Sequence, residues 1–517
     1  MILLKMAQAA VHRWPATRPA ARLLARIVRA FFPDALGPPP NARTPASQPS
    51  ESQAEPVAEP RPQLEPTAVA GAEPQPAAPA PDRFDELWPA LRADLDELRE
   101  VAHVLNPSEA FQSIVRAGRQ PPPAVLRGRL MRDALARMPR KVRHIVALPW
   151  LGFNGGSERV SQNLLRMLAE HYDEDECCVV APEAIFDLPL SEQRRYGMPI
   201  LAFNDLDTQM DSDTRLELFD RLMVQFRPAT VHTVNSTVAW LAFRYRGAQY
   251  SRDTRLFGNV YSDIRIMEDI PVGAFWQYLP DTLDDMAGFV VDNRRVVERA
   301  RATYALPHED LARFHLTPTP VVGLRGNPQA DMRPFRDPGV RRSLWMSRVA
   351  WEKRLDVLKN IAERCPDRSF HIYGDRQEKG SLPLDLSWID AAHNVHRHGA
   401  FGILADIPFE QFDSFVFTTM AEGMPIAVLE AVAFGLPVVA PDVGGIGELI
   451  DEDTGWLVSG PDAVEEYIAA LDEIRARPDE AQRRVAAAQA RLAQRHSWEN
   501  FRRSFHAIPG YLDTGRA

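Results

Sequence analysis

Two glutamates near the end of the chain could act together on one ligand. Residues 421–450 read AEGMPIAVLEAVAFGLPVVAPDVGGIGELI, which places Glu422 in a Glu-Gly-Met-Pro turn and Glu430 eight positions further on. Eight residues of helix advance about 12 Å. The carboxylate pair of a glycosidase needs a separation of only about 5–9.5 Å, so that chemistry is excluded. The two carboxylates must contact different parts of one long ligand, or one of them is structural.

The residues around both glutamates predict a strand, a turn and then a helix. DSFVFTT (413–419) has the pattern of a buried strand, and AVLEAVAFG is helical, with Gly435 as its stop. Pro425 suits a first helical position, and Gly423 lets the main chain approach a ligand. The amides of such a helix start, at the carboxyl end of a parallel strand, can bind an anion or a hydroxyl. A nucleotide sugar would fit, with its diphosphate at the helix start and its sugar and ribose on either side.

The helix that carries Glu430 is apolar on nearly all sides, since Val428, Leu429, Ala431 and Val432 surround that glutamate. A charged group in such surroundings usually has a partner or a ligand. We therefore expect Glu430 to be functional. The alternative is a solvated helix face, on which glutamates at this spacing are common.

Residues 414–450, followed by TGWLV, resemble the signature region of retaining glycosyltransferase family 4, which has the GT-B fold. The family pattern combines Glu-Gly-aromatic-or-Met-Pro, a second Glu in Leu-Glu-Ala, Gly-x-Pro-Val-Val and Gly-Gly-x-x-Glu. The resemblance implies that Glu430 accepts hydrogen bonds from the ribose of the donor. It also implies a set of contacts to the hydroxyls of the donor sugar, from Glu422 and the backbone of Gly423, Met424 and Pro425.

A second segment, SLWMSRVAWEKRLDVL (343–358), resembles the Gly-Arg-(x)4-Lys segment of the same family, with Ser347 in place of the usual Gly. The resemblance makes Arg348 and Lys353 the pair that neutralises the donor diphosphate. A leaving nucleoside diphosphate needs positive charge, which side chains can supply. A surface ion pair is the alternative. We predict Glu422, Arg348 and Lys353 as catalytic residues.

Two further segments resemble parts of the family at matching places. FNGGSERVSQNLLRML (153–168) is similar to its Gly-Gly-x-Glu-Arg segment, so Gly155 and Gly156 would form a turn that faces the donor phosphate. A simple tight turn is the alternative. The segment lacks Gly-x-Gly-x-x-Gly, which counts against a dehydrogenase. HSWENF (496–501) is similar to the segment where a last helix crosses back to the amino-terminal domain.

The acceptor side departs from the family pattern. VHTVNS (231–236) fits a strand that carries a histidine, so His232 is a candidate acceptor-side residue, with a core histidine as the alternative. In VYSDIR (260–265), Ser262 and Asp263 stand where many members have His-Asp. The resemblance therefore does not assure a catalytic imidazole.

The elements that must position these residues follow from the alternation of strand-like and helix-like segments after residue 141. The alternation breaks near 325–340 and then restarts. Strands alternating with helices predict parallel sheets covered on both faces. We expect an α/β, GT-B protein with two Rossmann-like domains facing a cleft, at 141–330 for the acceptor and 331–495 for the donor. Residues 496–517 would cross back as a helix.

Three segments precede these domains and differ in composition. Residues 1–37 are basic, and a helix would place four arginines on one face and apolar residues on the other; the arginines are Arg18, Arg22, Arg26 and Arg29. This predicts either peripheral membrane contact through residues 18–32 or a partly disordered tail. Residues 38–82 are rich in Pro and Ala, which predicts a disordered linker. Residues 83–140 are predicted to be a helical segment, because residues 83–105 show a helical apolar stripe that suits a short coiled coil or a helix packed on the main body.

The bulk composition limits the function further. A net charge of −10 over 517 residues argues against nucleic-acid binding. The three cysteines form no metal-ligand pattern, which predicts reduced thiols in a cytoplasmic protein. No apolar run reaches the length of about 18–20 residues that spans a bilayer. No Asp-x-Asp motif lies in a suitable turn, so neither a metal nor another cofactor is expected.

Together with these features, the resemblance to family 4 implies a retaining, metal-independent hexosyltransferase. Its donor would be a UDP- or GDP-linked sugar, and its acceptor a hydroxyl of a glycan or of a lipid-linked glycan. The basic amino-terminal segment suits envelope or extracellular polysaccharide assembly in the cytoplasm or on the inner face of the cytoplasmic membrane. Two alternatives remain open: a non-catalytic GT-B module that binds a glycan or a partner protein, and a sugar-nucleotide epimerase of the same shape.

Overall fold

The structure is a computed structural model that describes most of the chain after residue 122. The described ranges are 123–149, 156–183, 197–208, 210–266, 270–321, 332–376, 384–401 and 404–512. The chain divides into two compact units, Met1–Val125 and Leu126–Ala517, and the second contains both sheet domains. The predictions for 1–37, 38–82 and most of 83–140 lie outside the described residues, as does Gly155.

The first domain of this unit contains a sheet of seven parallel strands in the order β3-β2-β1-β4-β5-β8-β9. The strands are β1 (His144–Ala147), β2 (Cys177–Ala181), β3 (Ile200–Ala202), β4 (Thr230–Thr233), β5 (Arg255–Val260), β8 (Met286–Val291) and β9 (Phe314–Leu316). Every residue of β1, β2 and β4 is buried, because helices cover both faces of a parallel sheet.

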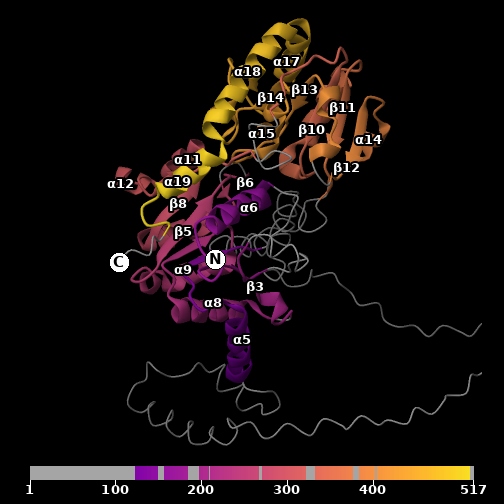
Figure 1. Ribbon diagram of the computed structural model, residues 1–517. Helices are drawn as coiled ribbons and strands as arrows, with labels where there is room; N and C mark the ends of the chain where they lie inside the picture. Colours follow the sequence, from indigo (N-terminus) through magenta and orange to yellow (C-terminus); the bar gives the residue numbers. More distant parts are fainter. Residues whose placement is uncertain are drawn as a thin grey trace, which may run out of the picture. The chain divides into compact units, whose positions relative to one another are not determined.

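Helices of this amino-terminal domain lie on both faces of the sheet (Figure 1). They are α5 (Pro123–Arg137), α6 (Gly156–Ala169), α8 (Ser212–Phe226), α9 (Thr237–Tyr250), α10 (Ala274–Thr282), α11 (Arg294–Tyr304) and α12 (His308–Leu311), with 3-10 turns η3 (Phe203–Asp205) and η4 (Leu283–Asp285). A short antiparallel ribbon joins β6 (Arg265–Ile266) and β7 (Ile270–Pro271). Polar residues cap three of the helices, and the one at α11 is Asn293, whose side-chain oxygen accepts from the Val296 amide.

The carboxy-terminal domain has a second parallel sheet of six strands, in the order β12-β11-β10-β13-β14-β15. The strands are β10 (Arg342–Met346), β11 (Ser369–Tyr373), β12 (Val395–Gly399), β13 (Ser414–Val416), β14 (Val438–Pro441) and β15 (Trp456–Val458). Side chains alternate across β10, so that Leu344 and Met346 enter one core and Trp345 the other.

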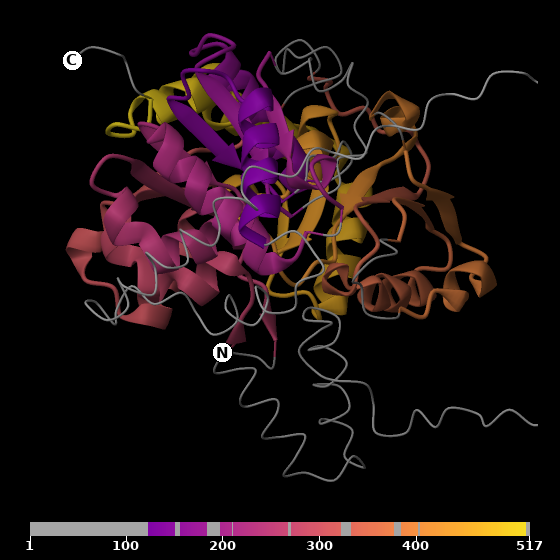
Figure 2. The ribbon, with the colours of Figure 1, turned by 90° about the horizontal axis from the view of Figure 1, so that it is seen from below.

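Helices cover this second sheet as well. They are α13 (Leu355–Arg364), α14 (Ser387–Ala391), α15 (Ile426–Ala433), α16 (Ile446–Leu449), α17 (Val464–Ala476) and α18 (Pro478–Arg495), with 3-10 turns η6 (Trp351–Lys353), η7 (Leu404–Asp406) and η8 (Phe409–Gln411). The predicted fold class, two Rossmann-like domains with parallel sheets, is confirmed. Figure 2 shows the two domains side by side.

The last helix, α19 (Trp498–His506), returns to the amino-terminal domain (Figure 1). Phe501 and Phe505 on α19 pack in one core cluster with Val146 and Val179 of the first sheet. Tyr511, which follows α19, is fully buried in the same cluster. Among the described helices, none combines the length and the apolar character that crossing a membrane would take.

Candidate active site

The turn that carries Glu422 connects β13 to α15 at the carboxyl end of the second sheet. α15 begins at Ile426, and Pro425 is its N-cap, one position before the first helical position predicted for it. The helix ends just before Gly435, which has a φ of 82°, a backbone conformation that favours glycine. The predicted helix stop is therefore confirmed.

Glu422 and Lys353, predicted from separate segments, form an ion pair in the structure. Lys353 belongs to η6, and its carbonyl oxygen accepts a hydrogen bond of 2.9 Å from the Thr418 hydroxyl, just after β13. The Lys353 ammonium also lies 5.6 Å from the ring centre of Phe417. The residues that follow β13 thus hold Lys353 beside the turn that carries Glu422.

Arg348, the other predicted diphosphate cation, lies two residues after the end of β10. Its guanidinium donates to the Glu352 carboxylate at 3.0 Å. Ser347, the residue before it, lies close to Gly374, which directly follows β11. Gly374 has a φ of 142°, and a Cβ added to Gly374 would lie 1.7 Å from the Ser347 carbonyl oxygen. A glycine at 374 therefore allows the approach of the main chain, while position 347 itself carries a serine.

Glu430 is buried on α15 and forms an ion pair with Arg159. Arg159 lies in the first turn of α6, whose first residue is the exposed Gly156. The expectation that Glu430 would have a partner is confirmed, and the partner comes from the other domain. Burial lowers the pKa of the Arg159 guanidinium. The two glutamates thus contact two different cations.

The main chain of the Glu-Gly-Met-Pro turn is in contact with the amino-terminal domain. The Met424 amide, predicted to face the donor sugar, donates a 3.0 Å hydrogen bond to the buried carboxylate of Asp292. A Cβ on Gly423 would lie 2.3 Å from the Tyr261 carbonyl oxygen. The prediction for the Met424 amide is therefore corrected: its hydrogen bond goes to Asp292, because the two domains meet at this turn.

Asp292 directly follows β8, and its carboxyl group has a raised pKa. Burial raises the pKa of its carboxyl to about 7, although hydrogen bonds from the Met424 amide and the Asn293 side chain oppose that rise. The Asn293 amide group donates to Asp292 at 2.7 Å. The carboxyl group at this domain contact therefore titrates near neutral pH.

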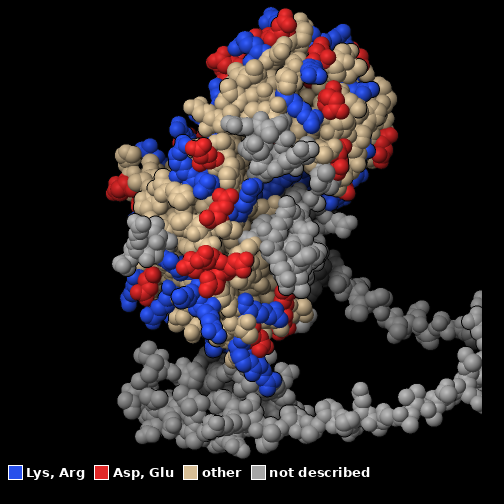
Figure 3. Space-filling model, viewed as in Figure 1, with Lys and Arg blue, Asp and Glu red and all other residues tan. Residues whose placement is uncertain are grey.

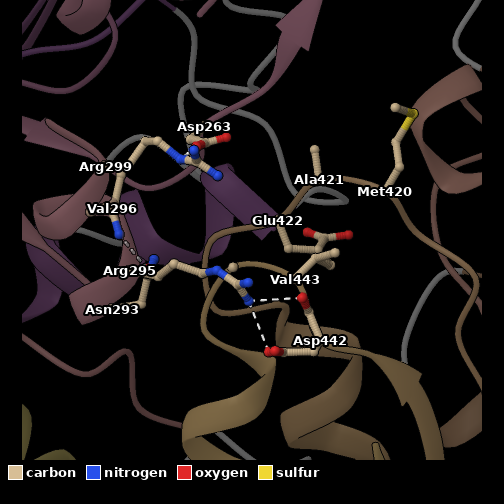
Figure 4. A pocket seen from close by; sticks show the side chains of 11 residues that line it. Asp263, Asn293, Arg295, Val296, Arg299, Met420, Ala421, Glu422, Asp442 and Val443 are labelled. Atoms are coloured by element: carbon tan, nitrogen blue, oxygen red, sulfur yellow. Dashed lines mark hydrogen bonds and ion pairs between the residues drawn. The ribbon is translucent and has the colours of Figure 1, made fainter. Parts of the chain in front are cut away.

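A pocket that is partly open to solvent lies between the two domains (Figure 4). Both domains line it, through Asp263, Asn293, Arg295, Val296, Arg299, Met420, Ala421, Glu422, Asp442, Val443 and Gly444. Positive and negative side chains lie next to one another on the surface where the domains meet (Figure 3). The pocket brings together the predicted sugar carboxylate, Glu422, and the predicted acceptor-side carboxylate, Asp263.

Arginines of the amino-terminal domain surround Asp263 in this pocket. Asp263 accepts from Arg265 at 3.3 Å and lies 2.7 Å from the Arg299 guanidinium. Arg295 reaches from α11 to Asp442, donating to its carboxylate at 2.8 Å (Figure 4). Asp263 is therefore held in place by charge.

Two of the residues predicted for the acceptor side lie differently. Ser262 is not among the pocket-lining residues, and its carbonyl oxygen accepts a 3.0 Å hydrogen bond from the Trp276 indole. His232 is completely buried in β4, and its Nδ1 lies 2.6 Å from the Tyr511 hydroxyl. Burial lowers the pKa of His232 to about 3. We therefore correct its interpretation to that of a core histidine, because the sheet and the segment after α19 enclose it.

Several residues of the site were not singled out from the sequence, namely Arg159, Asp292, Arg295, Arg299 and Asp442. Arg159 lies within the Gly-Gly-x-Glu-Arg segment and Asp292 directly follows a strand-like run, so their positions carried a signal. Asp442 likewise directly follows a strand, β14, whereas Arg295 and Arg299 on α11 carried no such signal. The pairing of Arg295 with Asp442 joins segments 147 positions apart and depends on how the domains meet.

Residues 341–476 match the family model described as Glycosyl transferases group 1. This matched segment, called the group 1 domain below, is about a quarter of the chain. The match runs from the start of β10 to the end of α17. The group 1 domain therefore contains all four of the charged residues predicted for the donor, which are Arg348, Lys353, Glu422 and Glu430.

Curated relatives are similar over part of their length. The chain is 32% identical over 115 residues to the O-antigen biosynthesis glycosyltransferase WbnH of Escherichia coli, which is 22% of this chain and 32% of that protein. It is 32% identical over 130 residues to the sulfoquinovosyl transferase SQD2 of Arabidopsis thaliana, which is 24% of this chain and 25% of that protein. The aligned stretch thus spans about a third or less of these relatives.

Solved structures share the fold over nearly their whole length. The crystal structure of TarM aligns with a TM-score of 0.55 and 10% identity, covering 72% of this chain and 99% of that one. Anabaena Alr3699/HepE in complex with UDP-glucose aligns with a TM-score of 0.54 and 14% identity, covering 70% and 97%. Since the group 1 domain and the domain before it are both covered, the two-domain GT-B architecture is shared.

Proposed function

We propose that this chain is a retaining glycosyltransferase that moves a hexose from a UDP- or GDP-linked sugar to a hydroxyl acceptor. One observation carries the proposal: Glu422, paired with Lys353 of the group 1 domain, lines the same pocket as Asp263 of the other domain. A donor-side and an acceptor-side group thus face one space. The family match and the glycosyltransferases among the relatives support sugar transfer.

The donor would bind through hydrogen bonds of two kinds. Its diphosphate would accept from Arg348 and Lys353, which form charge-assisted bonds with phosphate. Its sugar hydroxyls would donate to Glu422 and its ribose hydroxyls to Glu430, since an ionised carboxylate only accepts. Gly155 and Gly156 stay predictions for the phosphate side.

Transfer would follow the same-face route implied by family 4. The acceptor oxygen forms a bond to the anomeric carbon on the face from which the diphosphate departs. The bond between that carbon and the phosphate oxygen breaks with its electron pair on the oxygen, and a phosphate oxygen takes the acceptor proton. Arg348 and Lys353 would stabilise the negative charge that grows on the leaving group.

Side chains would supply this charge without a divalent metal or another cofactor. A turnover rate that is the same in EDTA and in MgCl₂ would support this part of the proposal. A rate that falls in EDTA and returns with added Mg²⁺ would contradict it.

The acceptor would be a glycan or lipid-linked glycan of envelope or extracellular polysaccharide biosynthesis. The similarity to an O-antigen biosynthesis enzyme supports this class. The basic pattern of residues 18–32 supports peripheral contact with the cytoplasmic face of the membrane, and hence a cytoplasmic location. Full-length protein should sediment with anionic vesicles, and a chain with the four arginines of this segment changed to Gln should not.

The test of the reaction is a transfer assay with UDP-glucose, UDP-galactose and GDP-mannose and a panel of glycan acceptors. Release of the nucleoside diphosphate gives the rate, and proton NMR of the product gives the anomeric configuration. An α-glycoside from an α-linked donor is the expected product. A β-glycoside would contradict retention, and nucleotide binding with neither transfer nor hydrolysis would favour the non-catalytic module.

A further inference from the structure

The two cations of the proposed donor site, and a third cation beside it, are each paired with a carboxylate. Arg348 pairs with Glu352, Lys353 with Glu422 and Arg159 with Glu430. The first two pairs lie within the group 1 domain, whereas Arg159 reaches Glu430 from α6 of the other domain. The three charges of each sign balance one another.

The pair of Arg159 and Glu430 repeats the relation between Lys353 and Glu422. In both pairs the carboxylate belongs to the stretch from the Glu-Gly-Met-Pro turn to α15, and it is the group proposed to accept from donor hydroxyls. In the Lys353 pair, the cation is proposed to bind the diphosphate. The repetition suggests that Arg159 has the same function at the ribose end.

In the pair of Arg159 and Glu430, the arginine is the side chain that is more accessible to solvent. The side chain of Glu430 is 5% exposed and that of Arg159 is 29% exposed. A guanidinium has five N–H donors in a planar fork, so it can hold one carboxylate and still donate to a phosphate oxygen. Burial also lowers the pKa of Arg159, because it destabilises the charged guanidinium. A bound anion would stabilise that charge.

We infer that Arg159 is a third cation for the donor diphosphate, supplied by the amino-terminal domain. The inference rests on the proposed donor site. The ribose hydroxyls donate to Glu430 while the Arg159 guanidinium donates to a phosphate oxygen next to the ribose. The donor is then held by both domains, so nucleotide binding favours the arrangement in which they meet.

The test compares UDP with uridine, which has the same ribose and base but no phosphate. We expect Arg159→Ala to weaken UDP binding about tenfold to a hundredfold, the value of one charge-assisted hydrogen bond. Uridine affinity should change less than about twofold, because the missing contact is to phosphate. Both are measured on the full chain, UDP by calorimetry and uridine by ligand-observed NMR.

Two variants control for charge and for the helix. Arg159→Lys keeps the charge and should recover part of the UDP affinity. Arg166→Ala removes an arginine from the same helix, where it lies 4.7 Å from the Trp498 ring centre, and should leave UDP binding unchanged.

Arg159→Ala leaves the buried Glu430 without its partner and could therefore unfold the chain. The same substitution is therefore also made in a second variant, Glu430→Gln. Glu430→Gln removes that charge. Adding Arg159→Ala to Glu430→Gln should weaken UDP binding again, by a similar factor. The thermal unfolding midpoint of each variant shows whether it is folded.

Three results would overturn the inference. UDP affinity that does not change in Arg159→Ala would show that Arg159 does not contact the donor. Equal losses for UDP and uridine would show that Arg159 only positions Glu430. A wild-type chain that binds none of UDP, GDP and ADP would overturn the proposed function, and this inference with it.

Discussion

The two domains have the same architecture but differ in how their charged residues are arranged. In the group 1 domain, the predicted residues Lys353 and Glu422 follow neighbouring strands and lie together, supported by the residues after β13. In the amino-terminal domain, the predicted His232 lies in the core. The groups at that domain's surface contact the other domain instead: Arg159 pairs with Glu430, and Asp292 accepts from Met424.

This difference follows from what each domain is proposed to bind. A diphosphate requires cations at fixed positions, and a ribose requires hydrogen-bond acceptors at fixed positions. The residues of the donor half therefore occur in short sequence motifs that can be recognised from the sequence. The acceptor half has charged groups, such as Asp263 between Arg265 and Arg299, whose arrangement depends on loops and on α11. The following changes test whether the two halves separate in this way.

The largest effect is expected from Lys353→Ala in the donor half. The turnover rate should fall by about a hundredfold to a thousandfold, the cost of losing one preorganised charge at the leaving group. The rate of nucleoside diphosphate release at saturating acceptor measures this. Lys359→Ala, on the exposed side of α13, is the matched control and should keep the wild-type rate. An equal rate in both variants would remove Lys353 from the site.

A smaller and more selective effect is expected from Asp263→Ala in the acceptor half. The KM for the acceptor should rise about tenfold, because a carboxylate that accepts from the acceptor would be lost. Nucleotide affinity should stay within about twofold of wild type, since Asp263 is not one of the proposed donor contacts. Asp281→Ala, which removes an exposed carboxylate paired with Arg244, is the control. Loss of nucleotide binding in Asp263→Ala would contradict the separation of the halves.

Asp292→Asn tests the contact between the halves through stability. Because the pKa of Asp292 is raised to about 7, the folded state holds this proton more tightly than the unfolded state does. The stabilisation is fully present below about pH 4 and is lost as the pH rises through about 7. Relative to Asp292→Asn, wild type should lose on the order of 4 kcal/mol of unfolding free energy between pH 4 and 8.

Urea unfolding of wild type and Asp292→Asn across that range measures the difference. Parallel pH profiles for the two proteins would mean that folding does not shift the pKa of Asp292. The Met424 amide would then donate to an ionised carboxylate at neutral pH.

The smallest effect on activity is expected from His232→Gln. This histidine lies in the core and touches the Tyr511 hydroxyl, so the change should leave the kinetic constants within about twofold. The free energy of unfolding should fall by about 1–3 kcal/mol. A large loss of turnover with unchanged stability would restore the acceptor-side interpretation.

Much of the fold was predictable from local patterns. The strand-like runs HIVALPW, ECCVVAP and FHIYGD became β1, β2 and β11, because buried parallel strands are apolar throughout. The short edge strands β3 and β9, of three residues each, were not predicted, because such short segments carry little periodicity.

The site was predictable where its residues belong to one chain segment. A charge inside the apolar helix α15 indicated that Glu430 needs a partner, but that partner, Arg159, lies 271 positions earlier. The burial of His232 depends on Tyr511, which the chain brings to β4 only after α19. Contacts of this kind depend on tertiary structure, which local periodicity does not encode.

The most direct test of the account is calorimetric titration of the full chain with UDP, GDP, ADP and CMP, without divalent metal and then with it. We expect that UDP or GDP binds without metal and that Arg348→Ala weakens this binding at least about tenfold. Binding of no nucleotide under either condition, or equal binding by Arg348→Ala, would contradict the claim that this cleft holds a nucleotide-diphospho-sugar.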